Sequence, residues 1–91
     1  MRAPATPRAH DGVLVQEAHG KTVLLRLADG GYYALDDLGA FIWARCDGRH
    51  TVDELVAAIL AEFDVPHDVV QADVESFLDE LFDENLLAKS S

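Results

Sequence analysis

The sequence lacks the features that stabilise or anchor many small proteins. It has a single cysteine, Cys46, among 91 residues, so no internal disulfide bond can form. One cysteine and four scattered histidines do not give the ligand spacing of a metal site. No apolar run approaches the roughly 20 residues that span a bilayer, and no secretory signal is recognisable. We therefore expect one cytoplasmic domain without metal, cofactor or membrane anchor.

Basic residues are missing from a long part of the chain. The net charge is −10, with 17 acidic and seven basic residues, and no Lys or Arg occurs between His50 and Ala88. Such a surface repels phosphate backbones and anionic lipid headgroups. We therefore expect neither a nucleic acid nor a membrane as partner. A plainer interpretation, that the charges only keep helix faces hydrated, stays open.

Catalytic motifs are also missing. Ser76, Ser90 and Ser91 are the only serines, and none lies in a nucleophile elbow. Gly30-Gly31 is not followed by the residues that complete a phosphate-binding loop. The acidic residues do not have the spacing of a calcium loop, and no Asp-Ser pair opens a helix to carry a phosphopantetheine arm. The sequence therefore predicts a binding protein and not an enzyme.

Three short segments at the start have the composition of β-strands: residues 12–18, 21–27 and 32–35. His19-Gly20 separates the first two, and a turn at residues 28–31 separates the second from the third. Because both connections are short, we expect an antiparallel meander in which the first and third strands are the edges.

The apolar spacing then changes to that of helices. Asp36 or Asp37 is suited to cap a first helix, which Asp47-Gly48 would end. Its apolar positions are Leu38, Phe41, Ile42 and Cys46, with Trp43 on the other side. We expect Cys46 to be a buried small hydrophobic residue.

Two further helices are predicted. Thr51 and Glu54 have the spacing of a capping box at the start of the second helix. Pro66 lies near the start of the third, and Asn85 is suited to a left-handed position after its end. The predicted fold is therefore α+β, a winged-helix-like module with a three-stranded antiparallel sheet followed by three helices. We expect a disordered lead-in at residues 1–11 and a domain at residues 12–88.

The third strand is the candidate binding surface. Gly31 to Leu35 contains neither the Lys nor the Pro that often protects an edge strand, so its free backbone groups are open to an extended peptide. A proline in place of Tyr33 is expected to remove an edge N–H. One flank of the third helix, with Val69, Asp73, Phe77 and Glu80, can form the opposite wall. Alternatively, the two tyrosines only pack a half-buried edge and Val69 covers a loop.

Several segments resemble the PqqD-like family. They are Gly31 to Trp43, Asp47 to Leu55, Phe63 to Val65, Asp73 to Leu81, and Leu86-Leu87. The resemblance covers roughly Val13 to Ala88. The chain departs from the family pattern at Asp36, where Asn is frequent, and at Asn85, where Gly is common.

The resemblance implies a recognition element of pathways that make ribosomally synthesised and post-translationally modified peptides (RiPPs). Such a module binds the leader segment of a precursor peptide as an additional strand and presents it to a maturation enzyme. Carried over by position, the peptide-binding residues are Gly31, Tyr32, Tyr33, Ala34, Leu35, Val69, Val70, Asp73, Val74 and Phe77.

The family includes proteins of two kinds of pathway. In lasso-peptide systems the maturation partner is a leader protease, and in pyrroloquinoline quinone (PQQ) biosynthesis it is a radical SAM enzyme. Tyr32-Tyr33 and Phe63-Asp64-Val65 slightly favour the lasso type. Two other functions remain open from the residues alone: a winged-helix-type transcription regulator and a structural subunit that pairs its edge with itself.

Overall fold

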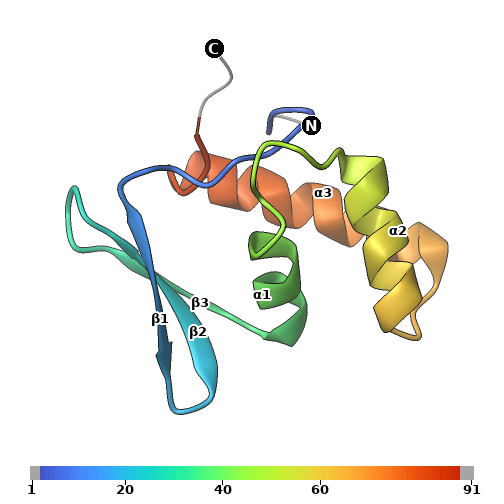
Figure 1. The fold of residues 1–91 in the computed structure, drawn as a ribbon, viewed down its shortest axis with the longest axis horizontal. Coiled ribbons are helices and arrows are strands. Elements are labelled where there is room, and N and C mark those ends of the chain that lie inside the picture. Colours follow the sequence, from blue (N-terminus) through green and yellow to red (C-terminus); the bar gives the residue numbers. More distant parts are fainter. Residues whose placement is uncertain (1–2, 89–91) are drawn as a thin grey trace.

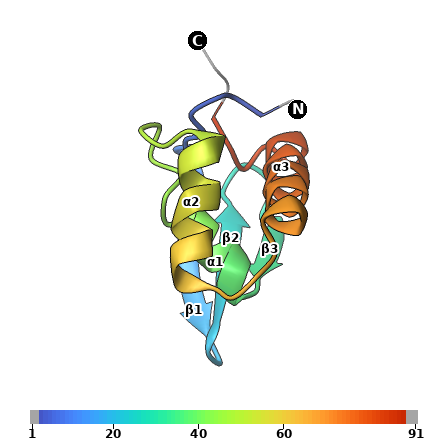
Figure 2. The same cartoon turned by 90° about the vertical axis from the view of Figure 1, so that its right-hand side faces the viewer.

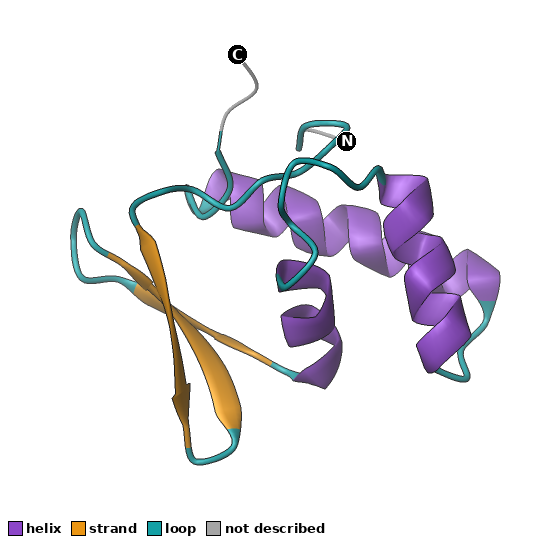
Figure 3. Ribbon diagram, viewed as in Figure 1, coloured by secondary structure: helices purple, strands orange, loops and turns teal. Residues whose placement is uncertain are grey.

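The computed structural model describes residues 3–88 and confirms the predicted order of three strands followed by three helices (Figure 1). The sheet occupies one end of the molecule and the helices the other (Figure 3). The elements are β1 Val13–Ala18, β2 Lys21–Arg26, β3 Tyr32–Leu35, α1 Asp37–Trp43, α2 Val52–Glu62 and α3 His67–Asp83.

The sheet is an antiparallel meander in the order β1-β2-β3. Ala18 pairs with Lys21 across a two-residue turn, in which His19 has φ 55° and Gly20 has φ 77°. Positive φ at both positions is the geometry that continues the right-handed twist of a hairpin. In the second turn Gly30 also has a positive φ, of 74°. The meander leaves β1 and β3 as the two edges, as the sequence predicted.

Helix α1 lies between the sheet and the other two helices (Figures 1 and 2). Asp36 caps it, because its carboxylate accepts a hydrogen bond of 2.7 Å from the N–H of Gly39. Ile42 and Trp43 are both buried, so the helix is covered on more than its predicted apolar side. A helix in the middle of the fold has little solvent-facing surface, and this explains why a one-sided pattern described it incompletely.

The predicted extension of this helix to Cys46 is wrong. The helix ends at Trp43, and the chain then tightens, because Arg45 and Cys46 each donate a 3.0 Å hydrogen bond to the carbonyl three residues before. Cys46 is nevertheless buried, with its Sγ 3.4 Å from the carbonyl oxygen of Ile42. Its burial is therefore as predicted, although it lies in a turn.

The start of α2 and the end of α3 are as predicted. Thr51 Oγ1 accepts a hydrogen bond from the N–H of Glu54, and the Glu54 carboxylate accepts one from the N–H of Thr51. After α3, Asn85 has φ 60°, and the N–H of Leu86 donates to the carbonyl of Leu81 at 2.9 Å. These bonds form a capping box and a Schellman motif, respectively.

The core contains residues from β2 and all three helices. Its largest fully buried side chains include Leu24, Ile42, Leu55, Ile59, Leu78 and Leu81. Within residues 3–88 no helix is both long enough and apolar enough to cross a membrane.

The N-terminal strap, defined here as residues 3–10, lies within the predicted lead-in and packs against two other parts of the chain. The N–H of Ala9 donates to the carbonyl of Cys46 at 2.9 Å, and the carbonyl of Arg8 accepts from the N–H of Ala88 at 2.7 Å. Pro7 is fully buried. The strap thus lies between the α1–α2 connection and the segment after α3, and its backbone has partners on both sides. Residues 1 and 2 lie outside the described part of the chain.

Candidate functional site

The edge of β3 presents unpaired backbone groups. The N–H of Arg26 donates to the carbonyl of Gly31 at 2.7 Å, whereas the next residue, Leu27, donates toward β1. Bonded and non-bonded pairs alternate along an antiparallel ladder. Tyr33 and Leu35 therefore point their backbone groups at β2, and Tyr32 and Ala34 point theirs outward. Within residues 3–88 no other strand pairs with β3. The open edge thus offers two N–H and two C=O groups.

The side chains of β3 alternate between the two faces of the sheet. Leu35 is buried and Tyr33 half-buried on the face toward the helices, whereas Tyr32 is 77% exposed on the other face. There Tyr32 lies opposite Leu25, which in turn pairs with Leu14 on β1. Tyr32 and Ala34 therefore contribute backbone groups to the edge and point their side chains away from the helices.

Tyr33 connects β3 to α3. Its hydroxyl interacts with the carboxylate of Glu80. Partial burial, that interaction and the negative charges of Glu80, Glu84 and Asp36 raise the pKa of Tyr33 to about 12. β3 and α3 lie on the same side of the molecule, with β1 on the opposite side (Figure 2). The open edge therefore runs beside an acidic helix.

Phe77 of α3 reaches the base of this region through the space above Gly39. A methyl group on Gly39 would lie 3.3 Å from Cζ of Phe77 and 3.4 Å from Cδ2 of Leu35. The missing side chain at Gly39 thus lets a ring from α3 approach β3 across α1. Phe77 remains only partly buried, so part of the ring is available to a ligand.

The other helix residues predicted for the site divide into two groups. Val69 is 53% exposed and Asp73 is exposed, on the same flank of α3 as Phe77. Val70 and Val74 are buried in the core, at 3% and 0% exposure. These two valines can support the flank from beneath but present almost no surface.

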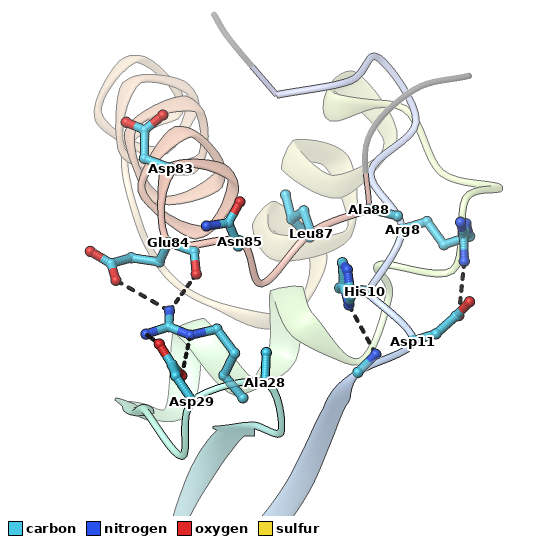
Figure 4. Close-up of a pocket in the computed structure, with 12 residues that line it drawn as sticks. Arg8, His10, Asp11, Ala28, Asp29, Asp83, Glu84, Asn85, Leu87 and Ala88 are labelled. Atoms are coloured by element: carbon cyan, nitrogen blue, oxygen red, sulfur yellow. Dashed lines mark hydrogen bonds and ion pairs between the residues drawn. The ribbon is translucent and has the colours of Figure 1, made fainter.

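Two features of this region were absent from the predicted site. Glu80 was recognised only as part of the helix flank, and Arg26 was not considered. Period-two alternation along β2 places Arg26 on the same face as Leu24, toward the helices, and that signal was available in the sequence. Arg26 also lines an open hollow of about 740 Å³ between the β2–β3 turn, the strap and the end of α3 (Figure 4).

The charged side chains of α2 and α3, apart from histidine, all have a negative sign. From His50 to Ala88 all charged side chains other than histidine are acidic. Among residues 3–88 no three His, Cys, Asp or Glu side chains come together in a way that would hold a metal ion. The edge of β3 can therefore form hydrogen bonds to the backbone of a ligand, and the acidic helix beside it can attract positive charge.

Comparison with known proteins identifies a family for this chain. The family model described as "Coenzyme PQQ synthesis protein D (PqqD)" matches residues 21–87. The chain therefore belongs to the PqqD family. No curated protein sequence matches it.

Three solved structures share the fold. The TbiB1 structure in complex with the TbiA(beta) leader peptide is 32% identical, with a TM-score of 0.80 over 92% of this chain and 98% of that one. A lasso peptide synthetase B1 complexed with the leader peptide is 21% identical, with a TM-score of 0.83 over 93% and 100%. The PqqD truncation of Methylobacterium extorquens PqqCD, described as a stand-alone RiPP recognition element, is 25% identical, with a TM-score of 0.75 over 96% and 95%.

Proposed function

We propose that this chain binds the leader segment of a ribosomal precursor peptide as a fourth strand on β3 and presents it to a maturation enzyme in the cytoplasm. The observation that carries the proposal is the open edge of β3, where Tyr32 and Ala34 direct their backbone groups outward. The 32% identical relative TbiB1, which was solved with a leader peptide, supports it.

Strand addition explains how such a site can accept different peptide sequences and still prefer some of them. Backbone hydrogen bonds to Tyr32 and Ala34 bind any extended peptide, and the peptide side chains that face α3 meet Tyr33, Phe77 and Asp73. Ordering a flexible leader costs conformational entropy, so we expect affinities in roughly the nanomolar to micromolar range.

The chain would deliver its peptide without transforming it. A bound leader holds the rest of the precursor near the enzyme and raises the effective concentration of the segment to be modified. Two of the three similar structures contain a leader peptide, and one of these two is named a lasso peptide synthetase, which favours the lasso type over PQQ biosynthesis. The proposed partner is then a leader protease; for the PQQ type it would be a radical SAM enzyme.

Strand addition at β3 is tested with one proline substitution on each edge of the sheet. Ala34→Pro removes an outward N–H of β3, and Val15→Pro makes the matching change on β1, because the register with β2 turns Val15 outward as well. Binding is measured by fluorescence polarisation with two labelled probes: the TbiA(beta) leader and the leader of the precursor encoded beside this gene.

We expect saturable binding to the native protein and to Val15→Pro, and at least roughly tenfold weaker binding to Ala34→Pro. Circular dichroism must show that all three proteins are folded. No binding of either leader to the folded native protein, or equal affinity for both proline variants, overturns the proposal. Tyr33→Pro is unsuitable, because the structure shows that this N–H belongs to the β2–β3 ladder and not to the open edge.

A further inference from the structure

Arg26 connects the β2–β3 turn to the end of α3. Its Nε and Nη2 atoms donate to the two carboxylate oxygens of Asp29 at 2.8 and 3.1 Å. Its Nη1 donates to the carbonyl oxygen of Glu84 and lies 3.5 Å from the Glu84 carboxylate. The guanidinium group thus binds Asp29 of the β2–β3 turn and Glu84 at the end of α3, both of which are labelled in Figure 4. Only 23% of the Arg26 side chain is exposed, so these bonds are partly shielded from water.

Gly31 makes this connection possible. Arg26 lies opposite Gly31 in the ladder, and its side chain crosses β3 at that position to reach α3. A methyl group on Gly31 would overlap Nη2 of Arg26. The φ of Gly31 is not positive, so the backbone itself would accept alanine. Glycine at this position therefore serves the passage of the arginine and not a turn.

The end of α3 needs a positive charge from elsewhere. Its last turn contains no basic residue, and Glu80, Asp83 and Glu84 place negative charges at the end where the helix dipole is also negative. Arg26 supplies the missing cation from β2. Asp29 holds the guanidinium in place and also accepts the N–H of Gly31 at 2.9 Å, which joins the start of β3 to the same group of contacts.

We infer that Arg26 is a positioning residue that sets the separation between β3 and the C-terminal part of α3, and that Gly31 acts through it. The inference rests on the proposed function, because this separation is the space that an added leader strand would occupy. Arg26 itself need not touch the peptide.

Affinity for the leader is the first measurement. Arg26→Met removes the connection between the turn and α3. Arg45→Met is the matched control, because it removes the same charge at a different place: Arg45 lies over the Phe41 ring, at 3.5 Å from the ring centroid. Arg26→Lys keeps the charge but cannot form the same fork of hydrogen bonds. With the two leader probes named above, we expect roughly five- to tenfold weaker binding for Arg26→Met, an intermediate loss for Arg26→Lys, and native affinity for Arg45→Met. Native affinity in Arg26→Met overturns the inference.

Substitution of Gly31 tests whether this glycine acts through Arg26. Gly31→Ala should weaken leader binding in the native background, because the methyl group displaces the guanidinium. It should have a much smaller further effect in the Arg26→Met background, where no guanidinium is left to displace and only Asp29 Oδ1 lies near the methyl position, at 3.1 Å. Equal losses in both backgrounds would show that the methyl group blocks the peptide directly, and the role assigned to Gly31 would be wrong.

Positioning can also be measured without a peptide. Spin labels on Tyr32→Cys and Ser76→Cys, both at exposed sites, report the β3–α3 distance, while the native Cys46 is buried. We expect a broader distance distribution in Arg26→Met than in Arg45→Met. Unchanged distributions overturn the inference even if the leader binds. If the distributions change but the native protein binds no leader, the positioning role stands and the proposed function fails.

Discussion

The hydroxyl of Tyr33 on β3 interacts with the carboxylate of Glu80 on α3, so the open edge of the sheet lies against the helix beside it. Tyr33 therefore contacts α3 in addition to packing on the half-buried edge of the sheet. Its ring covers the sheet face toward the helices, and its hydroxyl helps to determine where the helix lies.

The ionisation of Tyr33 provides a direct test of this contact. Burial and the neighbouring acids raise its pKa to about 12, whereas the pKa of an unperturbed tyrosine is about 10. In an ultraviolet titration of the folded protein, we expect a phenolate transition near pH 12 that disappears in Tyr33→Phe and persists in Tyr32→Phe. A transition near 12 that survives Tyr33→Phe would contradict the assignment.

The same shift makes stability depend on alkaline pH. Because the folded pKa lies above the unfolded one, the contribution of Tyr33 is fully present below about pH 10 and is lost as the pH rises toward 12. Cys46, whose pKa burial also raises to about 12, acts in the same direction in every variant. Urea denaturation at several alkaline pH values should therefore show a shallower loss of stability in Tyr33→Phe than in Tyr32→Phe.

The fold could be predicted largely because its signals are local. Capping by Thr51 and Glu54, the turn at His19-Gly20 and the left-handed Asn85 each depend on a few adjacent residues, and all are present in the structure. The end of α1 was missed because Cys46 continues the helical spacing of apolar residues, although the chain tightens after Trp43.

The parts of the site that escaped prediction depend on contacts between distant segments. The Arg26–Glu84 contact joins residues 58 positions apart, and no spacing rule relates them. The direction of the backbone groups along β3 required the register with β2. The contacts of the strap with the segment after α3 likewise follow from tertiary packing, because its composition alone resembles that of a disordered segment.

The strap should contribute measurably to stability. A chain beginning at Gly12 loses the backbone hydrogen bonds of Ala9 and Arg8 and the buried Pro7. We expect its free energy of unfolding to fall by about 2–4 kcal/mol. Urea denaturation of the shortened and full chains measures the difference. Equal stability would mean that residues 12–88 form the complete folded unit, as the composition alone suggested.

The left-handed residue after α3 gives a second stability prediction. Asn85 has φ 60°, a conformation that costs a residue with a Cβ roughly 1–2 kcal/mol and glycine almost nothing. We expect Asn85→Ala to lower the free energy of unfolding by about 1 kcal/mol and Asn85→Gly to leave it unchanged or raise it. Thermal or urea denaturation of the pair distinguishes them; a larger loss in the glycine variant would contradict the role of backbone conformation.

Charge should tune which leaders bind. Asp73 is exposed on the flank of α3 that faces the edge, in a region without Lys or Arg, so a leader side chain directed at α3 gains most if it is basic. We expect a leader with lysine at such a position to bind roughly two- to fivefold more weakly when salt is raised from about 50 to about 500 mM, because screening shortens the reach of these charges. Replacing that lysine with alanine, or Asp73 with Asn, should flatten the dependence. Asp53→Asn on α2 changes the net charge equally and is the control. If Asp53→Asn flattens the dependence as much as Asp73→Asn, the effect comes from the net charge of the protein and not from the flank of α3.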